Sequence, residues 1–200
     1  MQRCFEISGA GRLREQGSMS FVRLVAPVVL LLGLMVPVAG AVEEPDGYRL
    51  EDYDAPVPDV LSGAHVVSDE AAHALWLSGR VAVIDVMPDF PRPKNLPKDM
   101  IWRGRARHSI PGAIWLTDVG YGELSEAGEA QFTKGLAFAT GGDQDAPLMF
   151  VCRADCWLSW NAARRAVAAG YTRVFWYPEG TTGWTFWEWP TERLKPWTPE

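Results

Sequence analysis

Residues 149–163 constrain the fold more than any other stretch of this 200-residue chain. Met149–Val151 is an apolar run typical of a short buried strand, and a loop then leads into a segment with helical spacing. The loop carries Cys152 and Cys156. A thiol at such a junction faces loop amide N–H groups and the positive end of a helix, which both favour the thiolate. We therefore predict that Cys152 is an exposed, reactive thiol and that Cys156 is its partner.

The remainder of the chain alternates between strand and helix patterns. Val81–Val86 is a continuous β-branched run that suits a central parallel strand covered on both faces. Ser68 is typical of a helix N-cap, followed by a helix that ends near Gly79. The order predicts an α/β fold with a central parallel sheet and helices on both faces. The other expected helices are 124–139 and 159–169, and the other strands are 63–67, 110–116, 147–151 and 174–177.

The N-terminal residues have the pattern of a signal peptide. Met19–Arg23 is a cationic head, Leu24–Val38 is apolar, and Ala39–Ala41 supplies small residues for cleavage. We expect residues 1–41 to be removed, translation to start at Met19, and the protein to reach the periplasm. The alternative is a membrane anchor, but the apolar run is too short and too rich in proline for a span of about 20 residues. No integral membrane span is expected after cleavage.

Three further segments are expected in the exported chain. Residues 42–63 are acidic and contain prolines, so we predict an extended or loose arm, followed by a domain over 64–190 and a tail over 191–200. The net charge of −6 argues against nucleic acid as a partner. A long loop before residue 108 either docks an anionic partner or is simply solvated; its basic residues are Arg92, Lys94, Lys98, Arg103, Arg105 and Arg107.

The cysteine pair leaves three alternatives open. Cys4 is lost with the leader, and the two remaining cysteines are four residues apart, too close to stabilise a fold much by a bridge. Residues four apart on a helix have Cα atoms about 6 Å apart, which a disulfide tolerates. The pair is a reversible disulfide, a sulfur relay or an inert structural pair. No metal site is predicted, because the histidines are scattered over positions 65, 73 and 108.

Several motifs, taken in order, resemble the rhodanese family. They are Ser68-Asp69-Glu70-Ala71, Val83-Ile84-Asp85-Val86, His108-Ser109-Ile110-Pro111-Gly112-Ala113, Phe150-Val151-Cys152, Ser159–Ala163, Gly170-Tyr171-Thr172-Arg173-Val174 and Pro178-Glu179-Gly180-Thr181-Thr182-Gly183-Trp184. The resemblance implies a rhodanese-like α/β fold with Cys152 at the position of the sulfur-carrying cysteine. It also implies that the loop binds substrate, through Arg153, Ala154, Asp155, Trp157, Leu158 and Ser159.

A narrower resemblance rests on the Cys152–Trp157 motif, the tryptophan-rich C-terminal part and the leader. The chain is similar to periplasmic proteins associated with PQQ-dependent catabolism that carry a Cys-Trp (CXXCW) motif, although three residues separate its cysteines. This implies a redox role beside alcohol oxidation by quinoprotein dehydrogenases. PQQ is then an indirect association, and no bound cofactor is predicted. The alternative is a non-catalytic module that binds such a dehydrogenase or its cofactor through tryptophans, with Trp157 best placed.

The loop also departs from an ordinary sulfurtransferase. No arginine lies between Ala154 and Ser159 to clamp thiosulfate, and Asp155 adds negative charge where an anion would dock. Arg153 remains as one anion contact. We therefore predict little thiosulfate sulfurtransferase activity. Asp85 ends a strand near this loop, where it either orients a loop group or accepts hydrogen bonds from the backbone of 107–112, and we expect the backbone bonds.

Overall fold

The computed structural model describes residues 42–90, 92–102, 104 and 106–199. The predicted signal peptide, residues 1–41, lies outside the described residues. Within the described part of the chain, none of the helices has the length and apolar character needed to cross a membrane. The elements in chain order are β1 (His65–Val66), α1 (Asp69–Leu77), β2 (Ala82–Asp85), β3 (Arg107–Ser109), β4 (Ile114–Trp115), α2 (Glu126–Thr140), β5 (Leu148–Val151), α3 (Trp157–Ala168), β6 (Val174–Trp176), α4 (Gly180–Phe186) and β7 (Glu192–Leu194).

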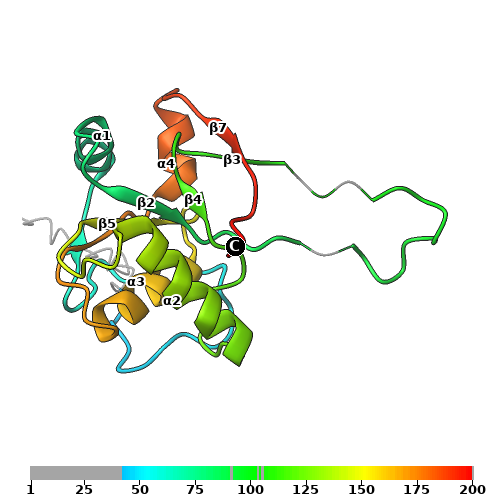
Figure 1. The fold of residues 1–200 in the computed structure, drawn as a ribbon, viewed down its shortest axis with the longest axis horizontal. Coiled ribbons are helices and arrows are strands. Elements are labelled where there is room, and N and C mark those ends of the chain that lie inside the picture. Colours follow the sequence, from blue (N-terminus) through cyan, green and yellow to red (C-terminus); the bar gives the residue numbers. More distant parts are fainter. Residues whose placement is uncertain (1–41, 91, 103, 105, 200) are drawn as a thin grey trace, which may run out of the picture. The chain divides into compact units, whose positions relative to one another are not determined.

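Five strands form a parallel sheet in the order β1-β6-β5-β2-β4, with β5 at its centre (Figure 1). The predicted central parallel sheet is confirmed. The carboxyl ends of β2 and β5 lie side by side, because Asp85 is paired with Val151. Residues that follow these two strands therefore meet at one edge of the sheet, where α/β folds place their sites.

Helices cover both faces of the sheet, as predicted. Successive strand residues point to opposite faces, so each strand contributes to two cores. Ile84 and Phe150 pack in the core that contains residues of α2 and α3. Val83 and Met149 pack in the other core, with residues of α1 and α4. Because helices pack on both faces, the central strands are buried on both sides and their sequences are continuously apolar.

The helix boundaries mostly follow the local capping signals. Ser68 caps α1 by accepting a hydrogen bond from the Ala71 N–H, and Gly141 ends α2 in the left-handed conformation. In contrast, α3 begins at Trp157 instead of the predicted residue 159. The Trp157 N–H donates to the Tyr53 carbonyl at 2.9 Å. A distant segment thus satisfies the first N–H of α3, which the sequence pattern did not reveal.

Residues 42–62, named here the strap, form no helix or strand and pack along α3. Asn161 accepts a hydrogen bond from the Arg49 N–H at 2.9 Å and donates to the Arg49 carbonyl at 2.9 Å. Trp160 donates to the Val60 carbonyl at 3.2 Å, and Arg165 lies over the Tyr48 ring. The strap is therefore an ordered cover on the helix that follows the cysteines, rather than a loose arm.

A small second sheet lies beside the main one. β3 pairs with β7 in antiparallel orientation, and β7 was not predicted, because residues 191–200 were expected to form a tail. After β7, the Trp197 N–H donates to the Trp115 carbonyl at 2.8 Å. β3 follows the long loop after β2 (Figure 1). Arg107, at the start of β3, donates to Asp85 at the carboxyl end of β2.

Candidate functional site

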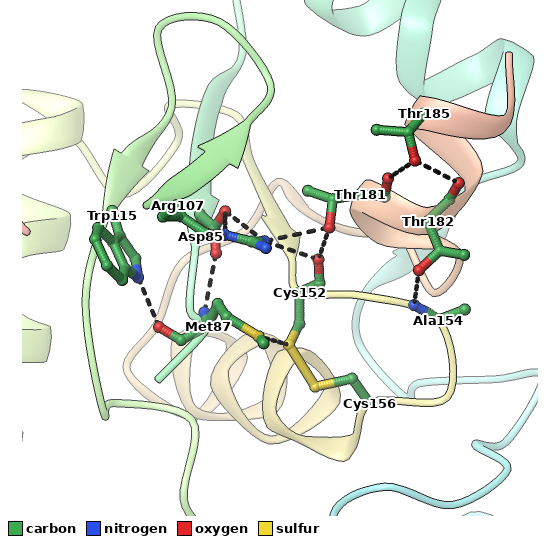
Figure 2. A network of polar contacts seen from close by, with 10 residues as sticks. All are labelled: Asp85, Met87, Arg107, Trp115, Cys152, Ala154, Cys156, Thr181, Thr182 and Thr185. Atoms are coloured by element: carbon green, nitrogen blue, oxygen red, sulfur yellow. Dashed lines mark hydrogen bonds and ion pairs between the residues drawn. A yellow bond between two sulfur atoms is a disulfide. The ribbon is translucent and has the colours of Figure 1, made fainter. Parts of the chain in front are cut away.

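The two cysteines lie at the carboxyl edge of the central strand. Cys152 directly follows β5, and Cys156 is the N-cap residue of α3. A disulfide joins them, with the Cα atoms 6.3 Å apart (Figure 2). Cys156 thus precedes the helix, so the predicted proximity arises from a tight loop instead of from helical spacing.

Both cysteine side chains are buried, which makes the prediction of an exposed Cys152 wrong. Cys152 is 0 % exposed and Cys156 is 2 % exposed. The Cys152 sulfur lies 3.6 Å from the Met87 sulfur, which covers it from the end of β2. The strap covers the other side, because Asp54 forms an isolated antiparallel bridge with Cys156. Contacts from two distant segments therefore close over a turn that would otherwise be open.

Two of the backbone amides that we expected to cradle a thiolate donate to other acceptors. The Ala154 N–H donates to the Thr182 hydroxyl at 3.1 Å. The Trp157 N–H, at the start of α3, donates to the Tyr53 carbonyl at 2.9 Å. These two donors thus hold the loop against α4 and the strap in the disulfide state.

A buried polar network fixes the backbone of Cys152 (Figure 2). The Arg107 guanidinium donates to the Cys152 carbonyl at 3.1 Å and to the Thr181 hydroxyl at 3.3 Å. It also forms an ion pair with Asp85 at 2.7 Å. The Thr181 hydroxyl donates to the same Cys152 carbonyl at 2.8 Å. One carbonyl therefore accepts from two side chains that come from β3 and α4.

Asp85 holds the centre of this network. It accepts a hydrogen bond from the Arg107 Nε at 2.8 Å and one from the Met87 N–H at 2.9 Å. The expected bonds to the backbone of 107–112 are replaced by the bond to the Arg107 side chain. Burial raises the pKa of the Asp85 carboxyl, and the Arg107 charge opposes that rise. Asp85 thus positions the arginine that holds Cys152.

Gly180, the first residue of α4, allows the close approach of this helix to the cysteine loop. Its φ is +50°, and a Cβ atom there would lie 2.9 Å from the Cys152 carbonyl carbon and oxygen. An isolated antiparallel bridge also joins Gly180 to Arg153. A side chain at this position would push the loop away from α4.

A pocket of about 330 Å³ opens beside Cys156. Apolar and aromatic side chains line it together with strap carboxylates, and the Cys152 side chain is not among them. The lining residues are Asp52, Tyr53, Asp54, Met87, Pro88, Phe90, Tyr121, Arg153, Cys156 and Leu158. Cys156 is therefore the one cysteine of the pair that lines this pocket.

The first three loop residues predicted to bind substrate have different surroundings. Arg153 is partly exposed and forms an ion pair with Asp54 of the strap. Ala154 offers its N–H to Thr182, as described above. Asp155 is exposed with φ +51°, a conformation that aspartate tolerates better than most residues. Only Arg153 of these three lines the pocket.

The next three predicted residues are buried at the start of α3. Trp157 donates from its indole to the Pro56 carbonyl at 3.1 Å, so its ring lies under the strap instead of forming an exposed platform. Leu158 is buried and lines the pocket. Ser159 donates to the Cys156 carbonyl at 3.1 Å and accepts from the Trp176 indole at 3.1 Å. Leu158 is thus the one member of this trio beside the pocket.

Sequence reasoning missed the strap and Arg107 as parts of the site. Arg107 was grouped with the basic loop, although a carboxylate at the end of a buried strand requires a cation or hydrogen-bond donors. The need of buried Asp85 for a cation was the sequence feature that could have predicted its pairing with Arg107. Nothing local pointed to Tyr53 or Asp54. Across the residues that the structure describes, no three metal-ligating side chains gather in one place.

The fold and site define an α/β domain with a cysteine loop at the carboxyl end of its central parallel strand. The family model for the rhodanese-like domain matches residues 68–186, and the chain belongs to that family. Comparison with curated proteins gave no match.

Two solved structures illustrate the likeness. A thiosulfate sulfurtransferase from Pseudomonas aeruginosa is 17 % identical over 66 % of this chain and 21 % of its own, with a TM-score of 0.45. The chain thus spans about a fifth of that protein. A polysulfide-sulfur transferase homodimer from Wolinella succinogenes is 14 % identical over 67 % of this chain and 82 % of its own, with a TM-score of 0.43.

Proposed function

We propose that this protein is an exported thiol–disulfide exchange factor whose Cys152–Cys156 bridge is reduced and re-formed in each cycle. The observation that carries the proposal is a disulfide at the carboxyl end of the central strand with one cysteine lining a pocket. A bridge that closes so small a loop adds little to stability. A role in thiol–disulfide exchange therefore explains the cysteine pair better than a role in stabilising the fold.

The surroundings of the loop favour exchange over transfer of sulfur from thiosulfate. Arg153 is the one arginine of the loop, and Asp54 already neutralises it. The amides of Ala154 and Trp157 donate to protein acceptors. These two amides are therefore not available to bind an anionic sulfur donor such as thiosulfate. A thiosulfate:cyanide assay is expected to show little turnover, and robust turnover would contradict this assignment.

The cellular setting of the proposal rests on the leader and on the Cys-Trp motif. The leader supports export to the periplasm, where thiol–disulfide couples operate. The motif supports a link to PQQ-dependent alcohol oxidation, in which this protein would exchange electrons or sulfur with a quinoprotein dehydrogenase or another periplasmic thiol protein. PQQ belongs to that dehydrogenase in this scheme, and the site described here is not assigned to hold it.

The cellular test joins a redox measurement to a growth phenotype. Periplasmic extract is quenched with acid and alkylated, and mass spectrometry then reports whether the two sulfurs are free, bridged or persulfidated. We expect a mixture of bridged and free forms, and slow growth of a Cys152→Ser strain on an alcohol. A strain with the wild-type gene, grown in parallel on the same alcohol, is the control. A fully bridged pool together with normal growth of the Cys152→Ser strain would refute the proposal.

A second candidate function is supported by exposed aromatic side chains at the end of α4. Phe186 is 76 % exposed and Trp187 is 47 % exposed. Exposed aromatic rings of this kind are common at interfaces, and they would suit a non-catalytic module that binds a dehydrogenase. This function predicts that replacing both rings with serine slows growth on alcohol while Cys152→Ser does not. The reverse pattern would favour exchange.

A further inference from the structure

The two sulfurs of the disulfide differ in what surrounds them. Cys152 has no exposed surface, lies against the Met87 sulfur, and has its carbonyl held by Arg107 and Thr181. Cys156 lines the pocket beside Tyr53. A nucleophile must approach a disulfide along the line of the sulfur–sulfur bond, on the far side of the sulfur that it attacks. Of the two cysteines, only Cys156 lines the pocket and keeps any exposed surface, which is 2 % of its total.

We infer that Cys156 is the sulfur attacked by an incoming thiolate, that Cys152 is the leaving sulfur, and that the preferred attackers are neutral or cationic thiols. This inference rests on the proposed exchange function and reverses the roles that the sequence suggested. It assigns the reacting position to the second cysteine and gives the substrate a chemical class.

The exchange step balances as follows. A partner thiolate forms a bond to the Cys156 sulfur while the Cys152–Cys156 bond breaks, and the bonding electron pair leaves on Cys152 as a thiolate. A second thiol of the partner, or of another molecule, then attacks the partner sulfur of the mixed disulfide. Its bond to Cys156 breaks, and Cys156 takes up a proton. The partner dithiol becomes a disulfide, and this protein is reduced by two electrons.

The charges around the pocket set the preference among thiols. Asp52 and Asp54 line it, whereas Arg153 is its one cation and is paired with Asp54. Tyr121 adds no negative charge, because burial first and nearby carboxylates second raise the pKa of its phenol. Arg49, which is outside the lining, lies 3.7 Å from Asp52 and offsets part of its charge. The lining itself carries an excess of one negative charge among its aromatic side chains. It should repel thiols that bear carboxylates and admit neutral or aminated ones.

The first experiment identifies the attacked sulfur in the purified wild-type protein. The protein is exposed briefly to cysteamine, and iodoacetamide then blocks the thiol that is released. Trypsin cleaves after Arg153, so the cysteines fall in separate peptides, 135–153 and 154–164. We expect the cysteamine adduct on peptide 154–164 and the carbamidomethyl group on peptide 135–153. The inference would be overturned by the reverse labelling or by an even split of the adduct between the peptides. It would also be overturned if no adduct forms at a cysteamine concentration that reduces the unfolded protein.

The second experiment tests the preference for charge. Rates of mixed-disulfide formation are compared for cysteamine and 3-mercaptopropionate, each divided by its rate with the urea-unfolded protein to remove intrinsic reactivity. We expect a ratio of about tenfold in favour of cysteamine at low salt, falling toward one at high salt. Asp54→Asn should lower the ratio, because it removes a carboxylate and frees the Arg153 charge. An unchanged ratio in this variant would contradict the proposed source of selectivity.

These outcomes are separable from failure of the proposed function. The labelling pattern depends only on which sulfur a thiol can reach in the purified protein. The cellular redox state and the growth phenotype depend on whether a partner uses that reaction. Labelling on Cys156 without a growth phenotype would therefore refute the function alone. Labelling on Cys152 with slow growth would refute this inference alone.

Discussion

The two ends of the disulfide are held by different kinds of structure. The inner side, around Cys152, consists of Asp85, Arg107, Thr181 and Gly180, which are buried or nearly so and joined by short polar contacts. The outer side, around Cys156, is the strap, whose ion pair to the loop is partly exposed. Buried polar networks are expensive to disrupt, whereas exposed ion pairs contribute little. One sulfur is thus held by a buried ion pair, whereas the ion pair that joins the strap to the loop beside the other sulfur is partly exposed and weak.

The largest expected effect comes from breaking the ion pair of the inner side. Arg107→Met leaves the Asp85 carboxylate buried without a counter-charge, and we expect a loss of about 3–5 kcal/mol in the free energy of unfolding at neutral pH. Denaturant titration measures it. The double variant Asp85→Asn with Arg107→Met should recover more than half of the loss. A loss below about 1 kcal/mol would show that the inner side is not the anchor.

The same variant predicts a change in the pH dependence of stability. Burial raises the pKa of Asp85 in the folded protein, and Arg107 opposes this rise. A carboxyl with a raised folded pKa contributes stability that is complete below its unfolded pKa and is lost as pH rises through the folded value. Relative to the double variant, Arg107→Met should therefore become less stable as pH is raised above about 4. Parallel pH profiles would contradict this.

Gly180→Ala should lower the free energy of unfolding by about 2 kcal/mol, because alanine must adopt a positive φ while its Cβ meets the Cys152 backbone. Two matched controls separate these causes. Gly141→Ala also has positive φ but has no neighbour within 4 Å, so it should lose about 1 kcal/mol. Gly47→Ala has neither feature and should change stability by less than about 0.5 kcal/mol. Equal losses at positions 180 and 141 would exclude a contribution from crowding at Cys152.

Asn161→Ala tests the outer side. It removes two hydrogen bonds to the strap and one to the Gly120 carbonyl. We expect the free energy of unfolding to fall by about 2 kcal/mol. We expect faster amide exchange across residues 47–54. If the substitution lowers the free energy of opening the strap by about 1.4 kcal/mol, the open form is about tenfold more populated. Reduction of the disulfide by dithiothreitol should then be about tenfold faster. Gly180→Ala, with a similar loss on the inner side, is the control and should accelerate reduction less.

The smallest effect on stability is expected for Asp54→Asn. The ion pair with Arg153 is partly exposed, so its loss should change the free energy of unfolding by less than about 1 kcal/mol. Thermal unfolding with and without salt measures this change. A loss comparable to that of Arg107→Met would erase the difference between the two sides of the disulfide.

Local patterns in the sequence predicted the fold well, and the reason is physical. The β-branched run before Val86 and the Ser68 cap determine structure within a few residues, so the parallel sheet and α1 follow from them. The site depends instead on contacts between distant residues. Asn161 meets Arg49 across 112 positions, and Arg107 meets Cys152 across 45. No periodicity encodes such contacts, so the burial of the cysteines could not be predicted.

The most direct test of the account is the equilibrium reduction potential of the Cys152–Cys156 pair. The purified protein is equilibrated in dithiothreitol buffers of defined potential, alkylated, and the fraction bridged is read by mass spectrometry. Exchange with other thiol proteins requires a potential above about −300 mV, and this is the result we predict. A potential far below that value would mark an inert structural bridge and contradict the claim that these sulfurs react.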